Sequence, residues 1–278
     1  MESTKEVRKR IIAFVFITYG ISSIFMYLII SAGSLRAGGG LFALGGMWSP
    51  GIAAILTQLF YRKSLREFGW KWGKTKYQLW SYAVPVFYAL SIHAFVWLTG
   101  LAGFVQDPVS EVIMTVLKGL AVGTVLGCIF ALGEEIGWQG FFIPLLARVT
   151  SFTKTALLRG IVWSVWHYPL IIFGVYGAKE LPVWYKLICF TVMLTGVSFV
   201  FAWFRLKSGS LWTGMFLHAS HNLFVQGLPG LTTDKGITAY LIDEFGLVSA
   251  AVALIVAFIF WKKRGQLTLN PTFLKQEN

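Results

Sequence analysis

Long apolar runs alternate with short basic connections along most of the chain. A helix needs about 20 mostly apolar residues to cross the hydrocarbon core of a bilayer. Eight runs fit this requirement, although the fourth and seventh carry polar residues. They are Ile11–Ala32, Leu41–Tyr61, Leu79–Leu101, Val109–Leu132, Ala156–Val175, Trp184–Phe204, Leu211–Leu228 and Phe245–Trp261. The pattern predicts an all-α, polytopic integral membrane protein with a single transmembrane domain over residues 1–278.

The fourth run poses a problem of length, because its apolar character continues as far as Leu146. One straight helix from Val112 to Leu146 would be about 50 Å long, well beyond the thickness of a bilayer. We therefore expect a break or bend at Gly137, Gly140 or Pro144.

Composition supports the membrane class, since 56% of the 278 residues are hydrophobic and 13% are charged. Soluble domains carry about 25% charged residues. The formal net charge is +12, but the basic residues lie in connections and no nucleic-acid-binding motif is present, so we expect no nucleic acid partner. The basic residues follow one side of the eight-span arrangement, with few exceptions. The exceptions are Arg36, Lys118, Lys179, Lys186 and Lys235. This bias predicts a multi-pass protein of the plasma membrane with both termini in the cytoplasm.

Ionisable residues within spans are candidates for a functional site. Glu134 and Glu135 follow the fourth run; alternatively, they cap a helix start or lie in water at the interface. On an α-helix, Glu135 and Gln139 share a face.

Histidines occur in two of the later runs. His167 lies in the fifth run, where a hydrogen-bonded core histidine is the simpler alternative. His218 and Asn222 share one face of the seventh run, with His221 at its edge. His93 has no polar neighbour at helical spacing, and we expect it to be structural. From the expected span starts, His167 lies about 16 Å and His218 about 10 Å into the membrane. We expect the glutamates and histidines to converge on one cavity in its cytoplasmic half.

Three segments resemble, in order, the motifs EExxxR, FxxxH and HxxxN of the CAAX protease and bacteriocin-processing family, also called ABI. They are EEIGWQ (Glu134–Gln139), WSVWH (Trp163–His167) and HASHN (His218–Asn222), within a core of residues 119–228. The resemblance implies an intramembrane glutamic endopeptidase that needs no cofactor. Its substrate would be a membrane-associated peptide or protein in the lipid bilayer, either CAAX-like or related to bacteriocins.

The resemblance also implies roles for the motif residues. Glu134 would activate water as a general base, and His167 would hold that water. His218 and Asn222 would stabilise the oxyanion, and Glu135 would support the site by hydrogen bonds. Peptide hydrolysis needs such a base and such donors.

Two positions depart from the family pattern. Trp163 replaces the Phe, and Gln139 replaces the Arg, which loses a charge and a fork of donors. Arg148 or Arg159 are candidates to replace that arginine.

Two alternatives to the glutamic mechanism remain at this point. Glu134, His167 and His218 could form a zinc set, although no H-E-x-x-H motif is present. The protein could also be a non-catalytic immunity or peptide-binding protein. The sequence does not indicate an oligomeric state.

Overall fold

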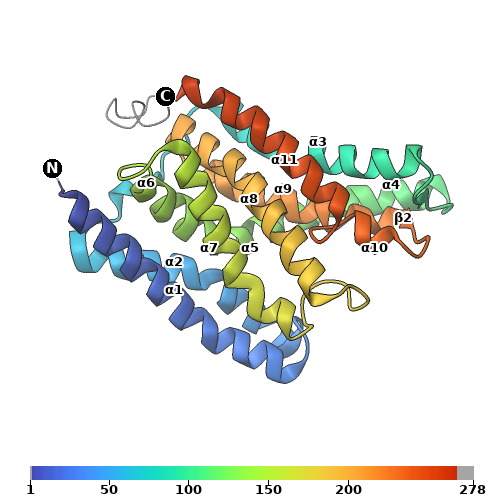
Figure 1. Cartoon of the computed structure of the whole chain (residues 1–278), viewed down its shortest axis with the longest axis horizontal. Coiled ribbons are helices and arrows are strands. Elements are labelled where there is room, and N and C mark those ends of the chain that lie inside the picture. Colours follow the sequence, from blue (N-terminus) through green and yellow to red (C-terminus); the bar gives the residue numbers. More distant parts are fainter. Residues whose placement is uncertain (1, 268–278) are drawn as a thin grey trace.

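The computed structural model describes residues 2–267, and its architecture is a bundle of helices (Figure 1). The prediction of an all-α membrane protein is confirmed. The α-helices are α1 Thr4–Ala32, α2 Leu41–Arg62, α3 Thr75–Leu98, α4 Val109–Lys118, α5 Thr124–Glu135, α6 Ile143–Leu146, α7 Phe152–Ile172, α8 Val183–Ser208, α9 Trp212–Val225, α10 Thr238–Leu241 and α11 Leu247–Lys262. Two short strands, β1 Gly103–Phe104 and β2 Thr232–Thr233, pair antiparallel.

Each of the predicted apolar runs is largely helical, but the number of spans stays a prediction. Five helical stretches are long and apolar enough to cross a membrane: Thr4–Ala32, Ala37–Arg62, Thr75–Leu98, Val109–Leu146 and Val183–Ser208. Among the others, α9 has 14 residues and α11 has 16. At about 1.5 Å per residue, both are shorter than the hydrocarbon core of about 30 Å.

The expected break in the fourth run takes the form of a change in helix type. The chain stays helical from Val109 to Leu146, but it is π-helical over Gly119–Gly123 and Ile136–Phe142. The second segment begins directly after Glu135 and contains Gly137 and Gly140. Because π-helical segments are rare and cluster at functional sites, this position singles out the glutamate pair.

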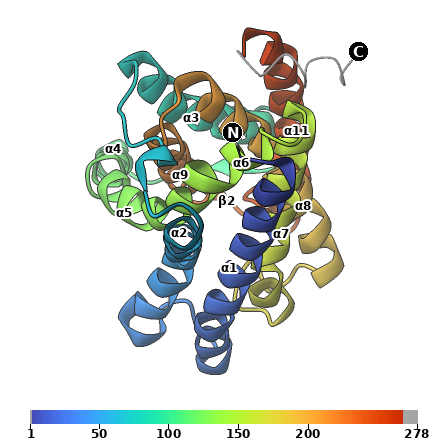
Figure 2. The ribbon, with the colours of Figure 1, turned by 90° about the vertical axis from the view of Figure 1, so that its left-hand side faces the viewer.

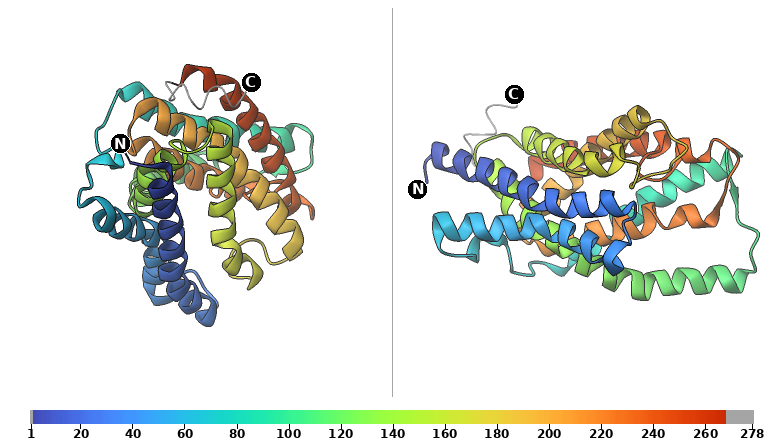
Figure 3. Two further views of the ribbon diagram at one scale, coloured as in Figure 1. Left: turned by 60° about the vertical axis from the view of Figure 1, so that its left-hand side comes forward. Right: turned by 90° about the horizontal axis from the view of Figure 1, so that it is seen from below.

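Small residues bring α2 against the helix that carries the glutamates. A Cβ atom on Gly51 would lie 2.5 Å from the carbonyl oxygen of Gly133, and one on Gly137 would lie 2.6 Å from Pro50. Only glycine allows such backbone contact, as in other membrane helix pairs. Helices α1 and α2 run side by side (Figures 2 and 3), and α7, α8 and α11 pack in succession behind them.

The bundle has two ends, which are defined by the chain termini and by the connections between helices. The start of α1 and the end of α11 lie at the same end of the molecule (Figure 1). Successive long helices run in opposite directions, so the α1–α2, α7–α8 and α9–α11 connections lie at the opposite end. We refer to these as the terminal end and the far end.

Candidate active site

A cavity of about 190 Å³ lies among α1, α2, α5, α7, α8 and α9. It brings together four of the predicted site residues, namely Glu134, His167, His218 and Asn222. A larger groove of about 560 Å³ between α7, α8 and α11 contains none of them. Three segments that are far apart in the sequence therefore meet in the smaller cavity.

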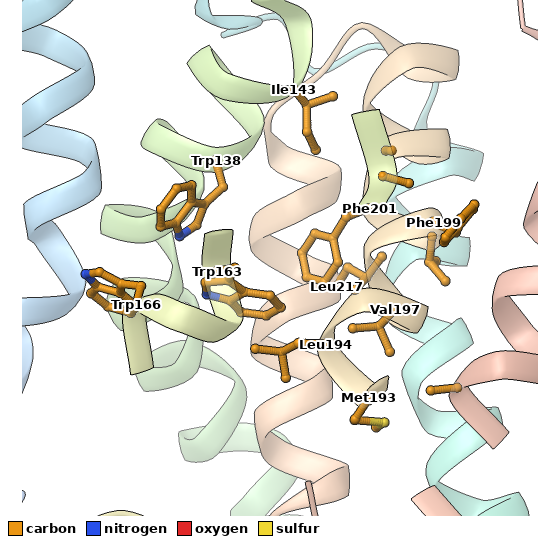
Figure 4. Packing of buried hydrophobic residues seen from close by; sticks show 14 of the residues in the cluster. Trp138, Ile143, Trp163, Trp166, Met193, Leu194, Val197, Phe199, Phe201 and Leu217 are labelled. Atoms are coloured by element: carbon orange, nitrogen blue, oxygen red, sulfur yellow. The ribbon is translucent and has the colours of Figure 1, made fainter. Parts of the chain in front are cut away.

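Glu134 is held in the cavity by two tryptophans. Its Oε2 accepts hydrogen bonds from Trp163 Nε1 at 2.8 Å and from Trp138 Nε1 at 3.3 Å. The carboxylate is buried, so the alternative that it lies in water at an interface is wrong. Figure 4 shows these indole rings close together, with Phe201 beyond Trp163. Trp163 therefore does more than pack, because it fixes one oxygen of Glu134.

The two cavity histidines are both anchored through Nδ1. His167 Nδ1 lies 2.9 Å from the carbonyl oxygen of Trp163, and His218 Nδ1 lies 2.9 Å from Glu135 Oε1. Both acceptors call for a proton on Nδ1, which leaves Nε2 as the free nitrogen of each ring. The His167 ring also packs against Trp166 and Phe190, with centroids 4.6 and 5.2 Å away.

Glu135 turns away from Glu134 and joins a buried ion pair. Arg159 Nη2 lies 3.4 Å from Glu135 Oε1, and Arg159 Nη1 donates to Ser198 Oγ at 3.0 Å. The guanidinium is stacked between Trp163 and Phe201, at 3.8 and 4.0 Å from the ring centroids. A planar, weakly hydrated cation suits such a stacked position. Arg159 thus supplies the charge that Gln139 lacks, whereas Arg148 pairs with Glu2.

The Gln139 side chain is buried beside Gly214 of α9, one helical turn before His218, which contacts Glu135. Gln139 Nε2 donates to the carbonyl oxygen of Phe201 at 3.1 Å, and its backbone oxygen accepts from Arg205 Nε at 2.6 Å. Glu135 and Gln139 therefore both face α9, although the segment that begins at Ile136 is π-helical.

His221, on the next turn of α9, belongs to a second buried network. Its Nδ1 is hydrogen-bonded to Tyr88, and its Nε2 lies 3.0 Å from Glu244 Oε1. Tyr176 also donates to Glu244, and both residues line the cavity. Burial opposes the charge on Glu244, but these hydrogen bonds outweigh it and hold the pKa of its carboxyl below the usual value. No sequence motif pointed to Glu244 or Tyr176.

The structure places His167 at a different depth in the bundle from the one expected. Helix α7 begins at Phe152 rather than Ala156, which places His167 about 22 Å from its start and about 8 Å from its end. The ring is therefore nearer the far end of the bundle than the terminal end. His93 lies outside the cavity, where its Nδ1 is 2.9 Å from the carbonyl oxygen of Ala89, as expected for a structural residue.

Residues 2–267 do not offer a ready set of ligands for zinc. Among residues 2–267, no group of three His, Cys, Asp or Glu side chains is arranged to hold a metal ion. Nδ1 of His218 is already engaged by a carboxylate, which leaves one nitrogen per histidine for any metal.

Comparisons with known proteins agree with the three motifs. Residues 116–224 match the family model described as Type II CAAX prenyl endopeptidase Rce1-like. The CAAX prenyl protease 2 of Methanococcus maripaludis is 33% identical over 138 residues, which cover 48% of this chain. The match spans about half of that relative, 49% of its length. Residues 116–224 are therefore similar to Rce1-like CAAX prenyl endopeptidases, and this similarity supports the CAAX protease and bacteriocin-processing family.

Proposed function

We propose that the protein is a membrane endopeptidase that uses Glu134 as the general base. The observation that carries the proposal is the placement of Glu134, His167, His218 and Asn222 in one cavity. The tryptophan N–H groups engage Oε2 of Glu134, so Oε1 is the oxygen that takes a proton from water. His167 Nε2 would hold the same water molecule.

The proposed reaction is a two-step hydrolysis. The activated water attacks the peptide carbonyl carbon, and its oxygen becomes an oxyanion that accepts hydrogen bonds from His218 Nε2 and the Asn222 amide. Glu134 then passes its proton to the amide nitrogen as the C–N bond breaks. Donors that are held in place before the reaction cost no reorganisation when charge develops.

Glu135 and Arg159 would act as positioning residues. The Glu135 carboxylate at Nδ1 of His218 stabilises the positively charged ring that donates through Nε2, much as a carboxylate does for the histidine of a catalytic triad. Arg159 in turn balances the charge of Glu135 inside the protein. Because Arg159 pairs with Glu135, this carboxylate has a cationic partner even though Gln139 carries no charge.

The substrate would be a membrane-associated peptide or protein. The similar protein of Methanococcus maripaludis is named CAAX prenyl protease 2, which supports a CAAX-like substrate, and the family resemblance also allows a bacteriocin-related peptide. Both would reach the cavity from the bilayer or its surface.

The purified protein tests the proposal directly. Cleavage of a peptide substrate should be lost in Glu134→Ala and His167→Ala, and it should persist in a strong chelator. Cleavage by Glu134→Ala at the wild-type rate would contradict the glutamate mechanism. Loss of wild-type cleavage in the chelator, with recovery on adding zinc, would favour the metal alternative.

A further inference from the structure

The cavity is closed on the side of the terminal end. An aromatic block lies there, in which the ring centroid of Phe14 is 5.5 Å from Trp138, 5.1 Å from Phe141 and 5.4 Å from Phe142. All four side chains are buried. Phe14 comes from α1, and the other three residues lie along the chain between Glu134 and the α6–α7 connection. A peptide cannot reach Glu134 from this side unless the block comes apart, because such interiors are close-packed.

The cavity opens on the side of the far end. Leu35 lies in the α1–α2 connection, Met47 lies in the second turn of α2 and Tyr176 lies in the α7–α8 connection. All three line the cavity and are partly exposed. Gln226, directly after α9, also lines it and is exposed. Since these residues come from three separate connections or helix ends, the mouth of the cavity faces the far end.

The basic residues identify the terminal end as the cytoplasmic one. The start of α1, the α2–α3 connection, the end of α8 and the end of α11 all carry clusters of lysine and arginine. The connections at the far end carry only isolated cations, such as Arg36, Lys179 and Lys235. Cytoplasmic connections of membrane proteins are the ones enriched in Lys and Arg.

We infer that the cavity opens to the non-cytoplasmic face and admits an apolar peptide segment of an exported or outer-leaflet protein. This inference rests on the proposed function for the chemistry of the site, but it selects the side of the membrane and the class of substrate. On the side of α1 and α2, the cavity is lined by apolar side chains: Met26, Ile29, Leu35, Ala43 and Met47. Such a lining suits an apolar segment and excludes a highly charged one.

Cysteine labelling in intact cells tests the side of access. In a background with Cys128→Ala and Cys189→Ala, Arg36→Cys reports on the far end and Lys71→Cys on the terminal end, and both original residues are exposed basic residues in connections. Gln226→Cys reports on the mouth of the cavity. A membrane-impermeant thiol reagent should label Arg36→Cys and Gln226→Cys in intact cells, and Lys71→Cys only after permeabilisation. The reverse pattern would overturn the inference.

A cleavage assay then tests the class of substrate. A quenched fluorescent peptide with an apolar centre and charged ends, which cannot cross the bilayer, is added to right-side-out or inside-out membrane vesicles. Cleavage should be at least tenfold faster in right-side-out vesicles, and faster cleavage in inside-out vesicles would overturn the inference. Labelling does not depend on cleavage, so an inactive protein would overturn the proposed function while the labelling still decides the side of access.

Discussion

Two buried histidine–carboxylate pairs lie three residues apart on α9, and they differ in what they leave free. His218 contacts Glu135 through Nδ1 only, and it lines the cavity. His221 uses both ring nitrogens, one with Tyr88 and the other with Glu244. A histidine with a free nitrogen at a cavity can take part in chemistry, whereas one with both nitrogens engaged holds helices together. The difference separates a candidate catalytic pair from a structural one.

The largest expected effect concerns the support of the first pair. Arg159→Ala removes the guanidinium that pairs with the buried Glu135, and breaking such a pair costs about 3–5 kcal/mol of stability. Thermal unfolding in detergent measures the loss. Arg148→Ala is the matched control, because the Arg148 side chain is 41% exposed beside Glu2 and such pairs contribute about 0–1 kcal/mol. Equal losses in the two variants would contradict the role of Arg159.

The first pair itself should matter for turnover. Removing one oxyanion donor typically lowers kcat by about 10²–10³, so we expect a loss of this size for His218→Ala. Steady-state cleavage kinetics on the folded variant measure it. If KM rises while kcat is unchanged, His218 binds the substrate and does not stabilise the oxyanion.

The second pair should matter for stability and much less for turnover. His221→Ala removes one hydrogen bond each from the buried Tyr88 and Glu244 and leaves Glu244 with Tyr176, at a cost of about 1–3 kcal/mol. We expect kcat to change less than tenfold while the unfolding temperature falls. A variant of normal stability with strongly reduced kcat would reverse the comparison between the two histidines.

The smallest expected effect lies beside the second pair. Burial, together with the adjacent Glu244 carboxylate, raises the pKa of Asp243 from 3.8 to about 7. The folded state therefore binds this proton more tightly, and stability falls as the pH rises between about 4 and 7. Solvent screening reduces the effect to the order of 1 kcal/mol.

Asp243→Asn tests this dependence because it cannot ionise. The variant should lose the fall in unfolding temperature between pH 4 and 7 that the wild-type protein shows. An unchanged pH profile would show that Asp243 is not the group responsible.

The sequence predicted the class of fold and four polar residues of the cavity, because apolar runs and polar residues within them are local signals. It did not predict that the chain would be π-helical after Glu135, since nothing in EEIGWQ shows that the helix widens there. Nor did it choose between Arg148 and Arg159 as the partner of Glu135, because that choice depends on how α7 packs against α5 and α8. Glu244 lies in a connection without a motif, and only the tertiary structure brings it to His221.

The most direct test of the central claim is a comparison of membrane-protein and exported-protein termini in cells that express the wild-type protein, Glu134→Gln, or the control Glu111→Gln. Glu111 is exposed on α4, outside the cavity. Because a positioned base contributes about 10²–10⁴ in rate, new termini made by the wild type and Glu111→Gln should be absent with a folded Glu134→Gln protein. Their persistence with Glu134→Gln at wild-type levels would contradict the assignment of Glu134 as the base.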